Sequence, residues 1–167
     1  VNARPRSTAA EALRSIRTNI LFRTPDNGPQ KRLLIASAVP REGKSFISSN
    51  LSTIIAMTGS RVLLIDADLR RPTQHKLFGL GNEVGVSSVL VDGLPVEQAI
   101  KRTHVEGLDL MSSGPRPVNP AELLGSSSMT TMLDSLTMYD FLIIDSSPIG
   151  AVADPLILSR FVDGVLM

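Results

Sequence analysis

A glycine, a lysine and a serine stand in a row between an apolar run and a helical pattern. Gly43, Lys44 and Ser45 close the segment Ala38–Ser45, which follows the apolar run Leu33–Ser37. Glycine lets the backbone approach a phosphate closely, and a helix that begins here presents free N–H groups and the positive end of its dipole. Lysine adds a charge for the β- and γ-phosphates, and the serine hydroxyl can bind Mg²⁺. The segment predicts a Walker A loop that binds a nucleoside triphosphate with Mg²⁺.

Two carboxylates follow a second apolar run. Asp66 and Asp68 stand two residues apart after Val62–Ile65, and side chains at this spacing on an extended segment point the same way. Open α/β sheets bind ligands at the carboxyl ends of their strands. Like charges at this distance repel and raise a pKa unless a cation lies beside them, and Mg²⁺ on the nucleotide supplies one. The alternative is a pair of aspartates that end the strand or cap a helix.

A third acid ends another apolar run. Phe141–Asp145 reads as a Walker B strand, and Ser146-Ser147-Pro148 follows it. Such a run is a frequent accident by itself, but as a later strand of the same sheet it makes Asp145 a Mg²⁺ partner, directly or through water. Asp154 is either a supporting group or a helix cap before Pro155.

Alternating strand and helix patterns must position these groups. The expected strands are Leu33–Ser37, Arg61–Asp66, Leu108–Ser112, Phe141–Asp145 and Val162–Met167. The expected helical segments are Lys44–Met57, a broken region from Thr73 to Lys101, Pro120–Leu136 and Pro155–Phe161. Continuously apolar strands are typical of parallel sheets buried on both faces. The pattern predicts an α/β fold of the P-loop NTPase type, with a doubly wound, mostly parallel sheet flanked by helices.

A separate helix precedes this core. Thr8 and Glu11 have the spacing of a capping box, and the helix is expected to end before the loop Pro25–Pro29. At about 100° per residue, one arc of the helix is apolar. It holds Ala9, Leu13, Ile16 and Ile20. A neighbouring stripe is charged, which by pattern alone indicates a solvated face. It holds Glu11, Arg14 and Arg17.

The composition excludes several classes of protein. The 167 residues are 43% hydrophobic and 20% charged and lack cysteine, which predicts one globular domain over 1–167 without disulfides or cysteine-bound metal. Within it, 1–30 form the helix and loop and 31–167 the nucleotide-binding core. Lysine and arginine total 17 against 16 acids, so nucleic acid is not an expected partner. The sequence has no apolar run of about 20 residues and no signal-peptide pattern. Because it begins at Val1 and stops at Met167, it is expected to be a piece of a longer chain.

Taken together, these motifs resemble those of the bacterial tyrosine kinases of capsule and exopolysaccharide assembly. The resemblance covers nearly the whole chain, including the charged stripe on the first helix, which matches the oligomerisation helix of that family. The matching segments are Ser37–Ser45, Ile65–Pro72, Asp145–Pro148, the stripe Glu11/Arg14/Arg17, Leu77–Leu80 and Asn119–Leu124.

The resemblance implies a role for each site residue. Asp68 would act as the base or positioning group for the tyrosine hydroxyl, with Arg70 as a further catalytic group, and Lys44 would stabilise the charge that develops during transfer. Mg²⁺ would be held by Ser45, Asp66 and Asp145. The phosphates of ATP would be wrapped by Pro40, Arg41, Glu42, Gly43, Lys44, Ser45 and Phe46.

The resemblance also implies an ATP- and Mg²⁺-dependent autokinase that phosphorylates C-terminal tyrosines of neighbouring subunits in a ring. Such an enzyme would regulate exopolysaccharide polymerisation and export at the cytoplasmic face of the bacterial inner membrane. Its partners would be other copies of itself, a cognate tyrosine phosphatase, and a membrane-spanning portion of the same chain or a separate membrane activator. The sequence stops before a tyrosine tail, and its single tyrosine, Tyr139, is expected to be packed.

Three other functions share parts of this pattern. The nearest is a partition- or division-site-type ATPase switch, against which stands Val39, at the position of that family's second, signature lysine. A binding-only module would not need Lys44, Asp66, Asp68 and Asp145 together. A small-molecule kinase would be expected to carry an arginine-rich lid after the sheet core.

Overall fold

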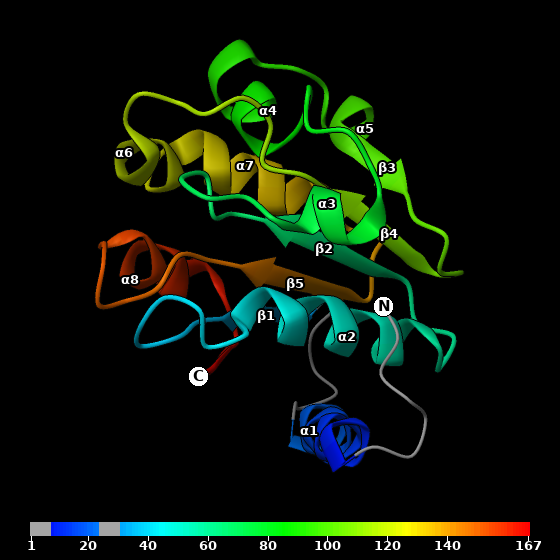
Figure 1. Ribbon diagram of the computed structural model, residues 1–167. Helices are drawn as coiled ribbons and strands as arrows, with labels where there is room; N and C mark the ends of the chain where they lie inside the picture. The colour runs from blue at the N-terminus through cyan, green and yellow to red at the C-terminus, as the bar shows by residue number, and fades with distance from the viewer. Residues whose placement is uncertain (1–7, 24–30) are drawn as a thin grey trace.

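A computed structural model describes residues 8–23 and 31–167, with side chains at 11–20 and from 31 onward. Six strands form one sheet in the order β3-β4-β2-β5-β1-β6 (Figure 1). The strands are β1 Lys31–Ile35, β2 Val62–Asp66, β3 Ile100–Arg102, β4 Leu108–Met111, β5 Phe141–Asp145 and β6 Gly164–Leu166. The helices are α1 Thr8–Arg23, α2 Lys44–Ala56, α3 Gln74–Phe78, α4 Val86–Asp92, α5 Val96–Ala99, α6 Pro120–Leu124, α7 Ser127–Ser135, α8 Asp154–Leu158 and the 3₁₀ turn η1 Ser159–Phe161.

The central strands bring the acidic groups to one edge of the sheet. β2 and β5 are parallel neighbours in a register that pairs Asp66 with Asp145. β1 lies on the other side of β5 and pairs Ile35 with Asp145. The Walker A loop, Ala38–Ser45, here called the P-loop, begins shortly after the end of β1 at Ile35. The loop and both aspartates therefore lie at the carboxyl ends of adjacent strands. This is the place where open α/β sheets bind their ligands.

The sheet has a packed apolar layer on each face, which confirms the predicted doubly wound architecture. On one face, Leu64 and Ile143 pack with Leu51 of α2. On the other, Leu63 and Leu142 pack among residues of α4, α6, α7 and α8. Neighbouring residues of one strand serve opposite layers because strand side chains alternate between faces. Figure 1 shows α1 and α2 on one side of the sheet and α4, α5 and α7 on the other.

The predicted strands lie where expected, but four of them differ by one or two residues at their ends. β2 begins at Val62 rather than at Arg61, and β4 ends at Met111 rather than at Ser112. β1 begins at Lys31 rather than at Leu33 and ends at Ile35, so Ser37 belongs to the loop. The lysine is accommodated because its ammonium lies 5.6 Å from the centre of the Phe141 ring, on the neighbouring strand. β6 covers Gly164–Leu166, which is shorter than the expected Val162–Met167.

Three predicted helical segments are corrected. The region predicted as helical from Thr73 to Lys101 contains three short helices and ends in β3, which pairs with β4 in antiparallel fashion at the sheet edge. The helix predicted over Pro120–Leu136 is divided into α6 and α7, because Gly125 ends α6 and Ser126 begins α7 from an extended conformation. The helix expected over Lys44–Met57 ends at Ala56, and Gly59 follows at φ 89°.

The first helix packs against the layer beside α2. Leu13 is buried there, and Ile16 and Ile20 pack partly buried against the same cluster. The side chains of Thr8 and Ala9 and the loop predicted at 25–29 lie outside the described residues. Tyr139 is packed as predicted: it is 7% exposed and its hydroxyl donates to Asp109 Oδ2 at 2.7 Å. Within 8–23 and 31–167, no helix is long and apolar enough to cross a membrane.

Candidate nucleotide-binding and active site

The loop between β1 and α2 has the conformation expected of a phosphate-binding turn. Arg41 and Gly43 both adopt positive φ angles, of 70° and 87°. Glu42 closes the turn by accepting the Val39 N–H at 3.0 Å. Helix α2 begins directly afterwards, at Lys44, and no side chain caps it. Its first N–H groups and dipole are therefore free to act on an anion held in the loop.

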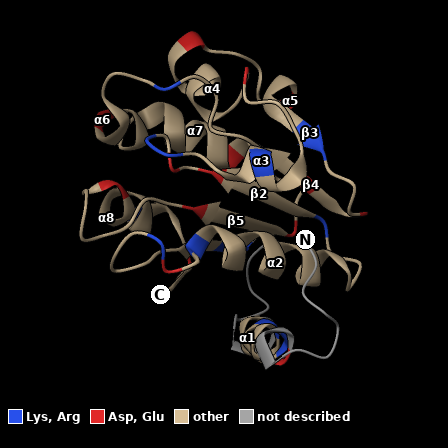
Figure 2. Cartoon of the chain, viewed as in Figure 1, with Lys and Arg blue, Asp and Glu red and all other residues tan. Residues whose placement is uncertain are grey.

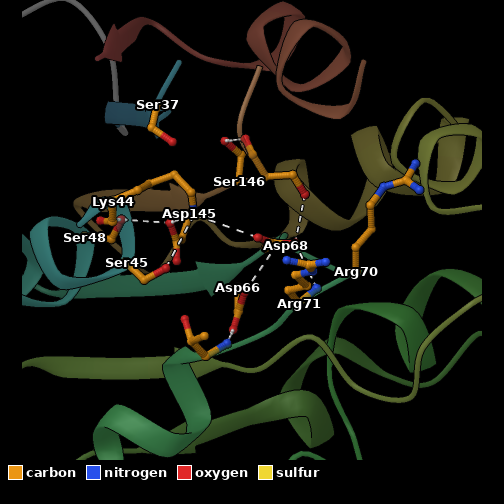
Figure 3. A network of polar contacts seen from close by, with 12 residues as sticks. Ser37, Lys44, Ser45, Ser48, Asp66, Asp68, Arg70, Arg71, Asp145 and Ser146 are labelled. Atoms are coloured by element: carbon orange, nitrogen blue, oxygen red, sulfur yellow. Dashed lines mark hydrogen bonds and ion pairs between the residues drawn. The ribbon is translucent and has the colours of Figure 1, made fainter. Parts of the chain in front are cut away.

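Lys44 points into the site and is held there by acids. Its ammonium lies 2.8 Å from Asp145 Oδ1 and 4.0 Å from Asp68 Oδ2, and it donates to Ser45 Oγ at 3.4 Å (Figure 3). Its side chain is only 7% exposed. One cation thus lies between the Walker B carboxylate and the carboxylate predicted to receive the substrate proton.

Asp145 is surrounded by donors and is fully buried. Its Oδ1 accepts from Lys44 and, at 3.1 Å, from the Ser48 hydroxyl of α2. Its Oδ2 accepts from Gln74 Nε2 at 2.6 Å. These contacts hold the carboxylate, which lies at the end of β5, from two other elements, α2 and α3.

Gln74 is a site residue that the sequence analysis did not predict. Its side chain is fully buried, and its Nε2 donates both to Asp145 and to the Ser45 backbone oxygen, at 3.0 Å. Its Oε1 is buried with no hydrogen-bond partner among the described residues. A glutamine at the start of a short helix carries no catalytic pattern, so only the three-dimensional placement identifies it as the link between the P-loop and the Walker B strand.

Asp66 occupies the floor of the site. Its Oδ2 accepts the N–H groups of Thr73 and Gln74, at 3.1 and 3.0 Å, so it supports the start of α3 as well as facing the site. The alternative of a capping aspartate is therefore correct in part. Burial first, and the negative charge of Asp145 second, raise the pKa of Asp66 to about 7. The Lys44 ammonium pairs with Asp145 and Asp68, and no ion pair of Asp66 is found among the described residues.

Asp68 faces the open part of the site in a fixed orientation. Its Oδ1 accepts the Ser147 hydroxyl at 2.8 Å and the Arg71 N–H at 3.0 Å. Its Oδ2 lies on the side of Lys44. Asp68 is thus held between the segment after β2 and the segment after β5, with one oxygen close to the position where a lysine would contact phosphate (Figure 3).

Arg70 is engaged elsewhere. Its guanidinium makes two hydrogen bonds to the fully buried carboxylate of Asp154, at 2.8 and 3.1 Å. This pairing raises the pKa of Arg70. It ties the loop after β2 to the first residue of α8, so Asp154 serves as a supporting group. The catalytic role of Arg70 stays a prediction.

The donor set fits Mg²⁺ carried on a nucleotide. Within the described part of the chain, no cluster of three acidic, histidine or cysteine side chains could hold a metal by itself. Mg²⁺ does not require one, because it keeps several waters and is usually bound by one or two protein oxygens plus phosphates. Ser45 Oγ lies next to the lysine that would contact those phosphates. The oxygens of Asp66 and Asp145 already accept protein donors, which suits contact with the ion through water.

A cleft of about 750 Å³ opens over these groups. It lies where the P-loop, the loop after β2, the loop after β4 and the segment after β5 meet. Of the predicted site residues it includes most of the loop positions, Lys44, Asp68 and Arg70. The lining residues are Ser37, Pro40, Arg41, Gly43, Lys44, Ser45, Phe46, Asp68, Arg70, Arg71, Thr73, Leu77, Arg116, Ser147, Pro148, Ala151 and Val152.

The charged stripe of α1 does not belong to this cleft. Glu11 and Arg14 are exposed and form an ion pair at 2.8 Å, and Arg17 is half-buried. Their predicted role in oligomerisation therefore concerns a different surface.

Comparison with known proteins places the chain in a family. The family model described as an AAA domain matches residues 41–159, which include the phosphate-binding loop from Arg41 onward, the three aspartates and α8. The septum site-determining protein MinD from Pyrococcus horikoshii, solved with Mg-ADP, has a TM-score of 0.70 at 22% identity, over 81% of this chain and 56% of that one. This likeness shows the fold alone.

Two tyrosine kinases are much more similar. The kinase domain of Escherichia coli tyrosine kinase ETK superposes with a TM-score of 0.91 at 36% identity, over 98% of this chain and 64% of that one. Tyrosine-protein kinase YwqD of Bacillus subtilis is 46% identical over 164 residues, which are 98% of this chain and 69% of the relative. Since this identity extends over more than two thirds of the relative, the chain belongs to the family of bacterial tyrosine-protein kinases.

Proposed function

We propose that this chain transfers the γ-phosphoryl group of ATP to the hydroxyl of a protein tyrosine. The observation that carries the proposal is the placement of Asp68. It lies beside the P-loop lysine, it is fixed by Ser147 and by the Arg71 N–H, and it lines the open cleft. A carboxylate in this position can accept a hydroxyl proton while the loop holds the phosphates.

The proposed reaction assigns one task to each group. The P-loop N–H groups bind the β- and γ-phosphates, and Lys44 leaves Asp145 to contact them. Ser45 directly, and Asp66 and Asp145 through water, would hold Mg²⁺, which would supply positive charge beside the phosphates. The phenolic oxygen forms a bond to the γ-phosphorus as the bond from phosphorus to the β–γ bridging oxygen breaks. The phenolic proton passes to Asp68, and ADP leaves.

The acceptor tyrosine comes from outside the described fold. Tyr139 is the single tyrosine of the sequence, and it is packed and hydrogen-bonded to Asp109. We therefore propose that the acceptors are tyrosines of neighbouring subunits, presented in a ring that the Glu11/Arg14/Arg17 surface helps to form. The rest of the assignment follows the family: activity at the cytoplasmic face of the inner membrane with a membrane partner, reversal by a tyrosine phosphatase, and control of exopolysaccharide export.

Phosphotyrosine formation tests the activity. The chain is incubated with ATP, Mg²⁺ and a tyrosine-containing peptide, and phosphotyrosine is measured by mass spectrometry. We expect product with the natural sequence and a loss of at least a hundredfold with Lys44→Met or Asp68→Asn. ATP hydrolysis with nucleotide-dependent dimers and no phosphotyrosine would instead identify an ATPase switch. Equal product from the Lys44→Met variant would reject the kinase.

Light scattering tests the assembly separately. We expect the triple variant Glu11→Ala, Arg14→Ala, Arg17→Ala to form smaller particles than the natural chain and to phosphorylate other copies more slowly. Its phosphorylation of a free peptide should be unchanged, because the stripe lies outside the cleft. An unchanged particle mass would reject the proposed surface.

A further inference from the structure

The cleft is lined by far more positive than negative charge. Five of its lining residues are lysine or arginine, whereas Asp68 is the only acid among them. Figure 2 shows basic segments on the loops at the α6–α8 side of the sheet. Two of the five cations are already neutralised by buried acids, Lys44 by Asp145 and Arg70 by Asp154. Arg41 lies within the phosphate-binding turn, which leaves Arg71 and Arg116 without an assigned task.

Arg71 is fixed next to the group that receives the tyrosine. Its backbone N–H donates to Asp68 Oδ1, so the start of its side chain has a set position relative to that carboxylate. The residue is exposed and forms no ion pair with the described residues. Its guanidinium is thus available beside Asp68, in the part of the cleft that faces away from α2 (Figure 3).

Arg116 reaches the same cleft from a loop after β4 that hydrogen bonds hold at its base. Asn82 clamps this loop by exchanging two hydrogen bonds with Gly114, each of 3.0 Å. The hydroxyl of Ser87 donates to the Pro115 backbone oxygen at 2.6 Å. Gly114 has φ 76°, and a Cβ there would lie 2.5 Å from the Ser87 hydroxyl, so the loop is closely packed at its base. Arg116 itself is exposed and has no ion pair with the described residues.

We infer that Arg71 and Arg116 bind acidic residues flanking the acceptor tyrosine, so that this enzyme selects acidic tyrosine segments. The inference rests on the proposed function and names its substrate class. Guanidinium groups match carboxylates in geometry and charge. Pro148, Ala151 and Val152 line the same cleft and supply apolar contact for the aromatic ring. The tyrosine then lies at Asp68, and the flanking carboxylates lie along the two arginines.

Peptide binding in the presence of Mg-ADP tests this selection without depending on phosphoryl transfer. Two fluorescent peptides are compared by anisotropy, each with phenylalanine in place of the acceptor tyrosine. One carries two glutamates on each side and the other carries glutamines. We expect the acidic peptide to bind about tenfold more tightly at low salt, and this preference to fall as ionic strength rises. Arg71→Ala and Arg116→Ala should each lower the affinity for the acidic peptide by about threefold and leave the affinity for the glutamine peptide unchanged.

Arg160→Ala is the matched control, because Arg160 is exposed and does not line the cleft. It should leave both affinities unchanged. Equal binding of the two peptides, absence of binding by both, or an equal effect of Arg160→Ala would overturn the inference. A weaker affinity of Arg116→Ala for ADP would also overturn it, because the arginine would then belong to the nucleotide. Phosphotyrosine formation from a peptide with glutamine flanks still reports the kinase activity, so the two proposals fail separately.

Discussion

Asp66 should destabilise the metal-free protein at neutral pH. Its carboxyl group is fully buried beside Asp145, and its pKa is raised from an ordinary 3.8 to about 7. The folded protein therefore holds a proton that the unfolded chain has already released between about pH 4 and pH 7. Since the folded state binds more protons in this window, its stability falls as the pH rises through it. Replacing Asp66 by asparagine removes this effect.

The size of the effect follows from the pKa. At about 1.4 kcal/mol for each tenfold change in proton affinity, moving the pKa from 3.8 to about 7 corresponds to about 4 kcal/mol. Asparagine keeps one oxygen that can accept the N–H groups of Thr73 and Gln74, but these hydrogen bonds are no longer made to a charged group. The other oxygen, which accepts the Asp68 N–H, is replaced by an amide nitrogen. That loss costs about 2 kcal/mol. We expect Asp66→Asn to stabilise the metal-free protein by about 2 kcal/mol at pH 8.

The assay is urea unfolding with a chelator present, at pH 8 and at pH 4.5. The advantage of the variant should be about 3 kcal/mol smaller at pH 4.5, because this pH lies less than one unit above the unfolded pKa of 3.8 and only a small part of the linkage energy has accumulated there. Asp92→Asn makes the same chemical change at an exposed site and should alter stability by less than about 0.5 kcal/mol at either pH. An Asp66→Asn variant that is less stable than the natural chain at pH 8, or equally affected at both pH values, would contradict a raised pKa of Asp66 in the folded protein.

Three other variants probe the supporting structure. Gln74→Leu removes the amide that donates to Asp145 and to the Ser45 backbone oxygen. The variant should bind a fluorescent Mg-nucleotide at least tenfold more weakly. An unchanged affinity would show that the glutamine only fills space. Tyr139→Phe should cost about 1–2 kcal/mol in urea unfolding at pH 7. Because burial and Asp109 raise the pKa of Tyr139, the natural chain should lose that advantage as the pH rises above about 10, and a pH-independent difference would contradict this. Gly114→Ala should lower the free energy of unfolding by about 1–3 kcal/mol in the same assay, since φ is 76° and the new Cβ would clash with Ser87. An unchanged free energy of unfolding would show that the loop shifts to accommodate the methyl group.

Much of the fold and most of the site follow from local sequence patterns. The apolar runs of β2 and β5 and the Gly43-Lys44-Ser45 turn are contiguous signals, so their residue types predict both the elements and their chemistry. The parallel order of the sheet then brings Asp66 and Asp145 into register without further information.

The features that were missed depend on contacts between distant segments. Gln74 becomes part of the site because α3 turns back over Asp145, 71 residues away in the chain. Arg70 is paired with Asp154 across 84 residues, which no local pattern indicates. β3 is a strand because it borders β4 at the sheet edge, although its lysine and arginine resemble a helix end. In each case tertiary pairing decides the outcome over local preference.

The ratio of ADP to phosphotyrosine tests directly whether this chain transfers the γ-phosphoryl group to tyrosine. The chain is incubated with ATP, Mg²⁺ and a saturating tyrosine peptide, and both products are counted during the first turnovers. Transfer to tyrosine under the control of Asp68 predicts one phosphotyrosine for each ADP, with both products lost together in Asp68→Asn. ADP that accumulates without phosphotyrosine would show that water, and not a tyrosine hydroxyl, receives the phosphoryl group.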